Sequence, residues 1–196
     1  RNRTIRLDLL EEQDSNSPFY LFAQAEVNIQ WALLQGKFQE YFSAALNINR
    51  ADGLLNENAE KYPNFLPNKK STALINIVLG AVPSNLRGFL RTFGLAGNVQ
   101  NGVRELENLI LSIPKSNYGF YRDEVVFFYA LAETEAVKNK NNQQKILAQL
   151  ALLSNQSLLK TYLQGYVSSK NFKNDDALTY LLNGPKGNQY KDFAAI

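Results

Sequence analysis

Two glycines at the spacing of a phosphate-binding loop are the first residues whose arrangement could support chemistry. Gly97 and Gly102 are separated as in G-x-x-x-x-G, the pattern of a P-loop. A P-loop continues with Lys and Ser or Thr, which neutralise the phosphates and hold magnesium, whereas Val103 and Arg104 follow here. A P-loop also follows a strand, and the residues before this loop have a helical pattern. We therefore expect no nucleotide site, and we expect Gly102 to lie inside a helix where a neighbouring helix approaches closely.

The chain contains no histidine and no cysteine. Disulfides within the chain, Cys/His zinc sites, and Ser-His or Cys-His nucleophile pairs are therefore impossible. Carboxylates do occur in close pairs: Glu105/Glu107, Asp123/Glu124 and Glu133/Glu135. Residues one or two positions apart on a helix do not face each other, so these pairs indicate solvated helix faces. We expect no catalytic residue, no metal and no cofactor, and an enzyme that uses carboxylates, Tyr or Lys is the least favoured class.

The charge and hydropathy of the chain exclude further classes. Twenty-one Lys and Arg against 18 Asp and Glu give a net charge of +3, and the basic residues are scattered, so we expect no nucleic-acid partner. The longest apolar runs, Ala73–Val82 with Asn76 inside it and Val125–Ala132, are far shorter than the roughly 20 residues that span a bilayer. Both runs are typical of buried core helices.

The elements that must position any site are predicted to be helices throughout. Apolar residues recur at helical spacing in Val99, Val103, Leu106, Ile110 and Ile113, and again in Ile146, Leu150 and Leu153. Capping and turn residues separate helices expected at about 18–36, 37–62, 69–81, 84–93, 98–112, 120–138, 142–153, 157–170 and 174–183. No segment alternates as a strand would. The fold class is therefore all-α, with consecutive helices packed antiparallel across short connections.

Paired helices with short turns raise the question of repeats. The tetratricopeptide unit has 34 residues in two helices, with small residues where they touch. Gly165 and Ala177 are spaced like that unit's small residues, and Asp175-Asp176 resembles the usual start of its second helix. We predict antiparallel helix pairs stacked as a tetratricopeptide-like right-handed α-solenoid, with a compact helical bundle as the alternative. Residues 1–196 are expected to form one helical-repeat domain, and because the chain has no Met, we interpret it as a fragment of a longer one.

One segment carries a more specific resemblance. Ile75–Leu109 resembles the signature region of the tetratricopeptide repeat protein 39 / inclusion body clearance family. The residues that carry this resemblance are Pro83, Leu86, Leu90, Phe93-Gly94, Gly97, Gly102-Val103 and Leu106. Asn98 and Val103 stand where that family favours Asp and Leu.

The resemblance implies a helical-repeat fold without catalytic residues. Eukaryotic members of the family are associated with lipid handling and with clearance of protein inclusions. Its bacterial relatives often look exported, so a periplasmic or exported location is what the resemblance implies for this chain.

Two groups of residues are candidates for partner binding. Asn28, Trp31 and Gln35 share one face of the predicted helix 18–36, and polar and aromatic groups on a first helix are how a tetratricopeptide concave surface grips an extended peptide. The alternative for Trp31 is a core residue. A second group is a basic patch that could hold an acidic tail or lipid headgroups, against the alternative of dispersed surface charge: Lys69, Lys70, Arg87 and Arg91.

These observations leave three functional classes in order. The leading hypothesis is a non-catalytic scaffold that binds a protein or peptide on its concave surface, since stacked helix pairs build such surfaces and need no chemistry. A lipid-associated or membrane-peripheral protein is the alternative, motivated by the family resemblance and the basic patch. An enzyme is third.

Overall fold

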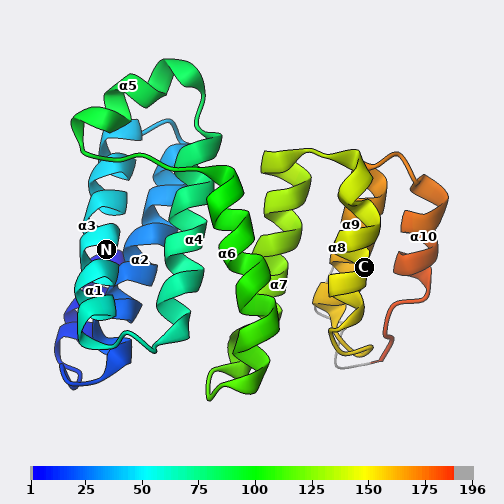
Figure 1. The fold of residues 1–196 in the computed structure, drawn as a ribbon, viewed down its shortest axis with the longest axis horizontal. Helices are drawn as coiled ribbons and strands as arrows, with labels where there is room; N and C mark the ends of the chain where they lie inside the picture. The colour runs from blue at the N-terminus through cyan, green and yellow to red at the C-terminus, as the bar shows by residue number, and fades with distance from the viewer. Residues whose placement is uncertain (1, 188–196) are drawn as a thin grey trace. The chain divides into compact units, whose positions relative to one another are not determined.

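The computed structural model describes residues 2–187, and these residues form helices and turns without any strand. The α-helices are α1 (Asn2–Glu11), α2 (Pro18–Lys37), α3 (Tyr41–Lys61), α4 (Leu66–Ala81), α5 (Ser84–Thr92), α6 (Val99–Ser112), α7 (Arg122–Leu131), α8 (Gln143–Ala151), α9 (Leu158–Lys170) and α10 (Asn174–Leu182). The predicted all-α class is therefore confirmed (Figure 1). The chain divides into two compact units at Gly119/Phe120. No helix in the described part of the chain is long and apolar enough to cross a membrane.

The α2–α3 hairpin is the framework of the first unit. Ser17 caps α2 by accepting a hydrogen bond from the Phe19 backbone N–H, and Pro18 occupies the first helical position, where its fixed φ suits a helix start. The connection to α3 turns at Gln39, whose φ is 63°. The two helices then run antiparallel (Figure 1). Their shared core consists of small and branched residues that allow close packing: Ala25, Ile29, Ala32, Ala45, Ile48, Ala51 and Leu55.

Helices α4 and α6 form the second antiparallel pair of this unit (Figure 1). A Cβ built on Gly102 would lie 2.6 Å from the Ala73 carbonyl oxygen and 2.6 Å from Ile77 Cγ1. One on Gly97, in the loop before α6, would lie 2.5 Å from the Asn76 carbonyl oxygen. The expectation that Gly102 marks a close helix approach is thus confirmed, and the glycine-rich loop serves packing.

Two details of this unit differ from the sequence prediction. Helix α4 pairs with α6 and not with the next helix, because the short α5 crosses over the ends of its neighbours (Figure 1). The helix expected to start at about 69 begins earlier, since α4 starts at Leu66 with Pro67 in its first turn. A proline is tolerated there because the first turn of a helix needs no N–H donor from it.

The second unit has its own core. Helices α7, α8 and α9 bury Val125, Tyr129, Ile146, Leu150 and Leu163, and α10 packs on α9. A Cβ on Gly165 would lie 3.0 Å from Leu181 Cγ of α10, so the predicted close contact at Gly165 is present. The predicted helix at 120–138 is interrupted, because Ala132–Val137 form a wider π-helical turn that ends at Lys138 with φ 58°.

Candidate functional site

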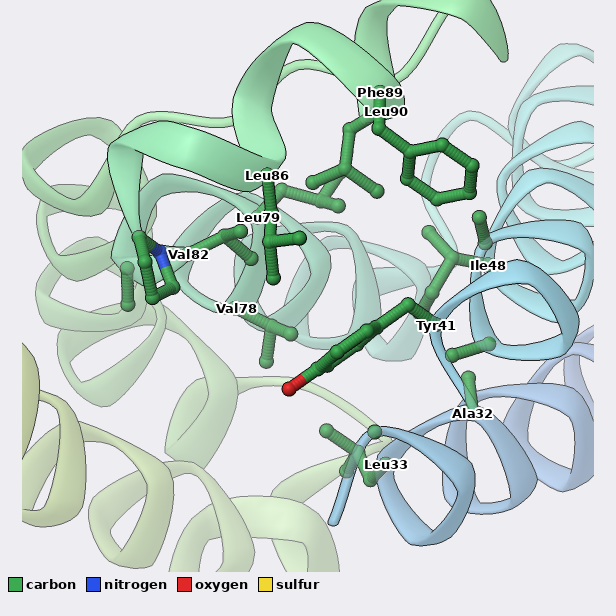
Figure 2. Close-up of a pocket in the computed structure, with 15 residues that line it drawn as sticks. Ala32, Leu33, Tyr41, Ile48, Val78, Leu79, Val82, Leu86, Phe89 and Leu90 are labelled. Carbon is green, nitrogen blue, oxygen red and sulfur yellow. The ribbon is translucent and has the colours of Figure 1, made fainter. Parts of the chain in front are cut away.

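An open pocket of about 420 Å³ lies in the first unit between the α2–α3 hairpin, the end of α4 and the inner face of α5 (Figure 2). Of the side chains that line it, only Tyr41 carries a polar atom. The rest are hydrocarbon, and Figure 2 shows them converging from the four helices: Ala32, Leu33, Ile48, Val78, Leu79, Val82, Leu86, Phe89 and Leu90. We call this cavity the apolar pocket. Pockets of this size and lining accept apolar ligand groups.

Helix α5 forms the outer wall of the apolar pocket and is held at its ends. Its buried side chain is Leu90. At its start, Arg87 donates from Nε to the Val82 carbonyl oxygen at 3.1 Å and from Nη2 to the Gly80 carbonyl oxygen at 3.3 Å. At its end, Asn49 donates to the Phe93 carbonyl oxygen at 3.0 Å. These hydrogen bonds join α5 to the end of α4 and to α3, and Leu86, Phe89 and Leu90 of α5 line the pocket.

Exposed apolar side chains surround the pocket at the turn between α2 and α3. Leu33 and Tyr41 line it and are 39% and 41% exposed. Four further apolar side chains at the end of α2, in the turn and at the start of α3 are exposed as well: Leu34, Phe38, Phe42 and Leu46. The apolar residues at the start of α3 and in the turn before it are therefore only partly core, since Ala45 and Ile48 are buried but Phe38 and Phe42 are not. Contiguous exposed apolar surface is typical of interaction sites in soluble proteins.

A second pocket of about 320 Å³ adjoins the first, since Leu79 and Leu90 line both. Arg87 and Arg91, which are one helical turn apart on α5, also line it. Arg91 is exposed and has no hydrogen-bond or ionic partner among the residues that the structure describes. This pocket gives the apolar site a positively charged edge.

The predicted basic patch does not form as one cluster. Lys70 is wholly buried and pairs with Glu26 at 2.9 Å, below the ring of Phe22. The prediction that Lys70 belongs to a surface patch is therefore wrong, because on α4 this side chain points toward α2. Lys69 is exposed and lies 3.8 Å from Glu105 of α6. It stands near the start of α4, about 16 Å along the helix axis from the end where Arg87 contacts Gly80.

Of the other predicted residues, Asn28 contacts Arg3 of α1 and Gln35 contacts Asn47 of α3, and Trp31 lies between them on α2. Asn28 is 1% exposed, and Trp31 and Gln35 are half-buried. Asn28 and Gln35 are joined through two residues that sequence reasoning missed, Arg3 of α1 and Asn47 of α3. The only sequence signal for Asn47 is a polar residue between the apolar Leu46 and Ile48, which does not distinguish a ligand from a surface position.

A third pocket, of about 270 Å³, lies in the second unit beside the π-helical turn. Its charged lining residues are Glu133, Glu135, Lys138 and Lys170. Lys170 Nζ lies 2.8 Å from Glu135 Oε1, and the Tyr166 hydroxyl donates to the same oxygen at 2.5 Å. Hydrogen bonds from Lys170 and then Tyr166 lower the pKa of Glu135. Since the two lysines and two glutamates offset each other, this pocket favours no particular ligand charge.

Metal and family comparisons add no assignment. The described residues contain no group of three or more Asp and Glu side chains that could hold a metal ion. No family model matches the chain, and no curated protein or solved structure matches it. The chemistry of the apolar pocket therefore remains the basis for assigning a function.

Proposed function

We propose that this chain is a non-catalytic helical scaffold that binds a protein or peptide by accepting apolar side chains in the apolar pocket. The observation that carries this proposal is the pocket's lining, which offers hydrocarbon on every wall and a single hydroxyl, that of Tyr41. Without an acid, a base or a nucleophile pair at this place, binding is what the site can do. Burying apolar area stabilises a complex by about 25 cal/mol per Å² before the costs of association.

The exposed residues around the pocket support a macromolecular partner. Leu34, Phe38 and Phe42 extend the apolar surface beyond the cavity, so a partner helix could seat one side chain in the pocket and lay others over the rim. We further propose that the antiparallel pairs α2–α3, α4–α6 and α9–α10 belong to a tetratricopeptide-like solenoid related to the family that Ile75–Leu109 resembles. In that arrangement the partner would lie along a concave helical face.

Filling the pocket tests the proposal. Ala44 lines the pocket, and Ala44→Phe places a ring in the space that a partner side chain would take. Ala151→Phe is the matched control, because Ala151 is exposed on α8 in the other unit. Each full chain would be immobilised and incubated with lysate of its source, and the retained proteins quantified by mass spectrometry. We expect one protein retained by the unmodified chain and the control and lost from Ala44→Phe, whereas equal retention by all three would refute the pocket's role.

The charged edge favours a second candidate, a lipid-associated or membrane-peripheral protein. Arg87 and Arg91 lie beside the apolar pocket, where they could contact anionic headgroups while the pocket holds an acyl chain. Each basic residue near an anionic membrane surface contributes about 1 kcal/mol to the free energy of membrane binding. Flotation with vesicles of anionic lipid at low salt would test it. Binding that Arg87→Gln/Arg91→Gln abolishes would support it, and absence of binding at low salt would remove it.

A further inference from the structure

Carboxamide groups of α2 and α3 surround one guanidinium in the first unit. Arg3 of α1 donates from Nη2 to Asn28 Oδ1 at 2.8 Å and to Asn47 Oδ1 at 2.6 Å. The two asparagines are 1% and 7% exposed, so their oxygens are reached only from the side of α1. The α2–α3 hairpin therefore presents two buried acceptors to a single donor group.

The orientation of these oxygens is fixed by the hairpin itself. Asn28 Nδ2 donates to the Gln24 carbonyl oxygen at 2.7 Å, one turn earlier on α2. Asn47 Nδ2 donates to the Ser43 carbonyl oxygen at 3.0 Å and to Gln35 Oε1 at 2.6 Å. Because the amide nitrogens are committed to their own hairpin, both oxygens must point outward. Buried acceptors without a donor are costly, so the pair requires a donor-only group, and a planar guanidinium with five N–H groups meets two acceptors well.

Helix α1 satisfies this pair but is itself weakly held. None of its residues is buried, and only Arg3, Leu7 and Leu10 are half-buried against the hairpin. Arg3 Nε is buried without a hydrogen-bond partner, and no carboxylate in the described part of the chain pairs with this guanidinium. Burial, and to a lesser extent the charge of Arg50, lower the pKa of Arg3. The contact thus depends on two neutral acceptors, and no carboxylate between residues 2 and 187 neutralises the charge.

We infer that Asn28 and Asn47 form a guanidinium-binding site, which α1 fills with Arg3, and that an arginine side chain of another polypeptide can take Arg3's place. We call it the carboxamide site. It shares no residue with the apolar pocket, since Asn28 and Asn47 hold Arg3 of α1 while the lining of the pocket on these two helices includes Ala32, Ala44 and Ile48. The inference therefore goes beyond the proposed function and does not depend on the pocket.

The test uses the full chain with Arg3→Ala, which empties the carboxamide site, and N-acetyl-arginine amide as the probe. Calorimetric titration should show that the probe binds the Arg3→Ala variant at least about tenfold more tightly than it binds the unmodified chain. In the unmodified chain Arg3 occupies the site and so lowers the apparent affinity for the probe. N-acetyl-lysine amide should bind at least about tenfold more weakly than the arginine probe, since a compact ammonium does not match a fixed pair of acceptors. Arg3→Ala/Asn47→Leu should lose the binding, while Arg3→Ala/Ala44→Phe, with the apolar pocket filled, should keep it.

Three results would overturn the inference: no binding to folded Arg3→Ala, equal binding of the lysine probe, or unchanged binding after Asn47→Leu. If circular dichroism shows that Arg3→Ala does not fold, the unmodified chain provides the decisive measurement. A high concentration of the arginine probe should then raise amide hydrogen exchange of α1, and the lysine probe should not. Exchange of α1 that stays equal with both probes would refute the inference.

Discussion

Lys69 and Lys70 are neighbours in the chain and lie in opposite environments. Lys70 is wholly buried against Glu26, which also accepts a hydrogen bond from the Ser71 hydroxyl, whereas Lys69 is exposed beside Glu105. We predict that Lys70→Ala lowers the free energy of unfolding by about 3 kcal/mol, because breaking a buried pair leaves its partner uncompensated. Lys69→Ala should cost less than about 1 kcal/mol, as exposed pairs do. Urea unfolding of both variants would measure the difference, and equal costs would contradict it.

The ion pair of the second unit predicts a pH dependence. Lys170 and Tyr166 lower the pKa of Glu135, so the stability this carboxylate contributes is present above its unfolded pKa and is lost as pH falls through the folded value. Glu135→Gln should therefore lower the melting temperature near neutral pH, and its difference from the unmodified chain should shrink below about pH 4. The effect is small because the pair is nearly half exposed. Melting curves across pH would test it, and a difference that grows in acid would be evidence against it.

For individual residues, the sequence shows which side chains are polar but not which part of the fold they face. Asn28 and Gln35 were predicted to bind a partner, and both bind residues of the same chain, since Asn28 accepts a hydrogen bond from Arg3 and Gln35 accepts one from Asn47. The burial of Lys70 could not be predicted, because its partner Glu26 lies 44 positions away. One residue along α4 turns a side chain by about 100°, and only the position of α2 decides which lysine is buried.

The crossing of α4 and α6 gives a prediction at the scale of elements. Replacing a helical glycine by alanine stabilises a helix by about 1 kcal/mol where there is space, but a Cβ on Gly102 would meet the Ala73 backbone. Gly102→Ala should therefore lower the free energy of unfolding, by about 1–3 kcal/mol for overpacking. Gly53→Ala on α3 is the control, since nothing lies within 4 Å of its Cβ. It should stabilise the chain. Chemical unfolding would decide, and similar shifts for both variants would disprove the close approach.

Helix positions were predictable because local signals set them. Helices were expected to start at about 18 and 98, and α2 and α6 begin at Pro18 and Val99, each capped by the side chain of the residue before it, Ser17 or Asn98. The start of α3 was predicted less well. The helix was expected from about residue 37, but α3 begins at Tyr41, after a turn in which Gln39 has a positive φ. The pairing of α4 with α6 across the short α5 was also beyond reach. From the order of the helices, α4 was expected to pack against α5, the next helix. In the structure α4 packs against α6 instead, where Gly97 and Gly102 allow close approach.

At the scale of the whole molecule, the two compact units predict two zones of local stability. Leu106 and Leu163 are each wholly buried in their own unit. Truncating either to Ala should cost about 2–5 kcal/mol, and native-state hydrogen exchange should rise mainly in the unit that carries the change. Exchange mapped by mass spectrometry would test this. A rise spread evenly over both units would show that they unfold together.

A site made by four helices is what the sequence could least predict. The apolar pocket combines Leu33, Tyr41, Val78 and Phe89, which look like ordinary core residues when each helix is read alone. Their packing leaves a space because α5 crosses the ends of its neighbours (Figure 1). The prediction of one helical-repeat domain over residues 1–196 stays a prediction, and the structure adds that the chain divides into two compact units at Gly119/Phe120.

Trp31 gives the molecule a built-in optical reporter. It is the only tryptophan in the chain, it is half-buried on α2, and it shares a helix face with Asn28 and Gln35. Indole emission depends on local polarity, so a change in the exposure of this face of α2 should shift its fluorescence, to longer wavelength where water gains access to the ring. The state of the carboxamide site can thus be followed in the unlabelled protein, in real time, while a competing arginine is added.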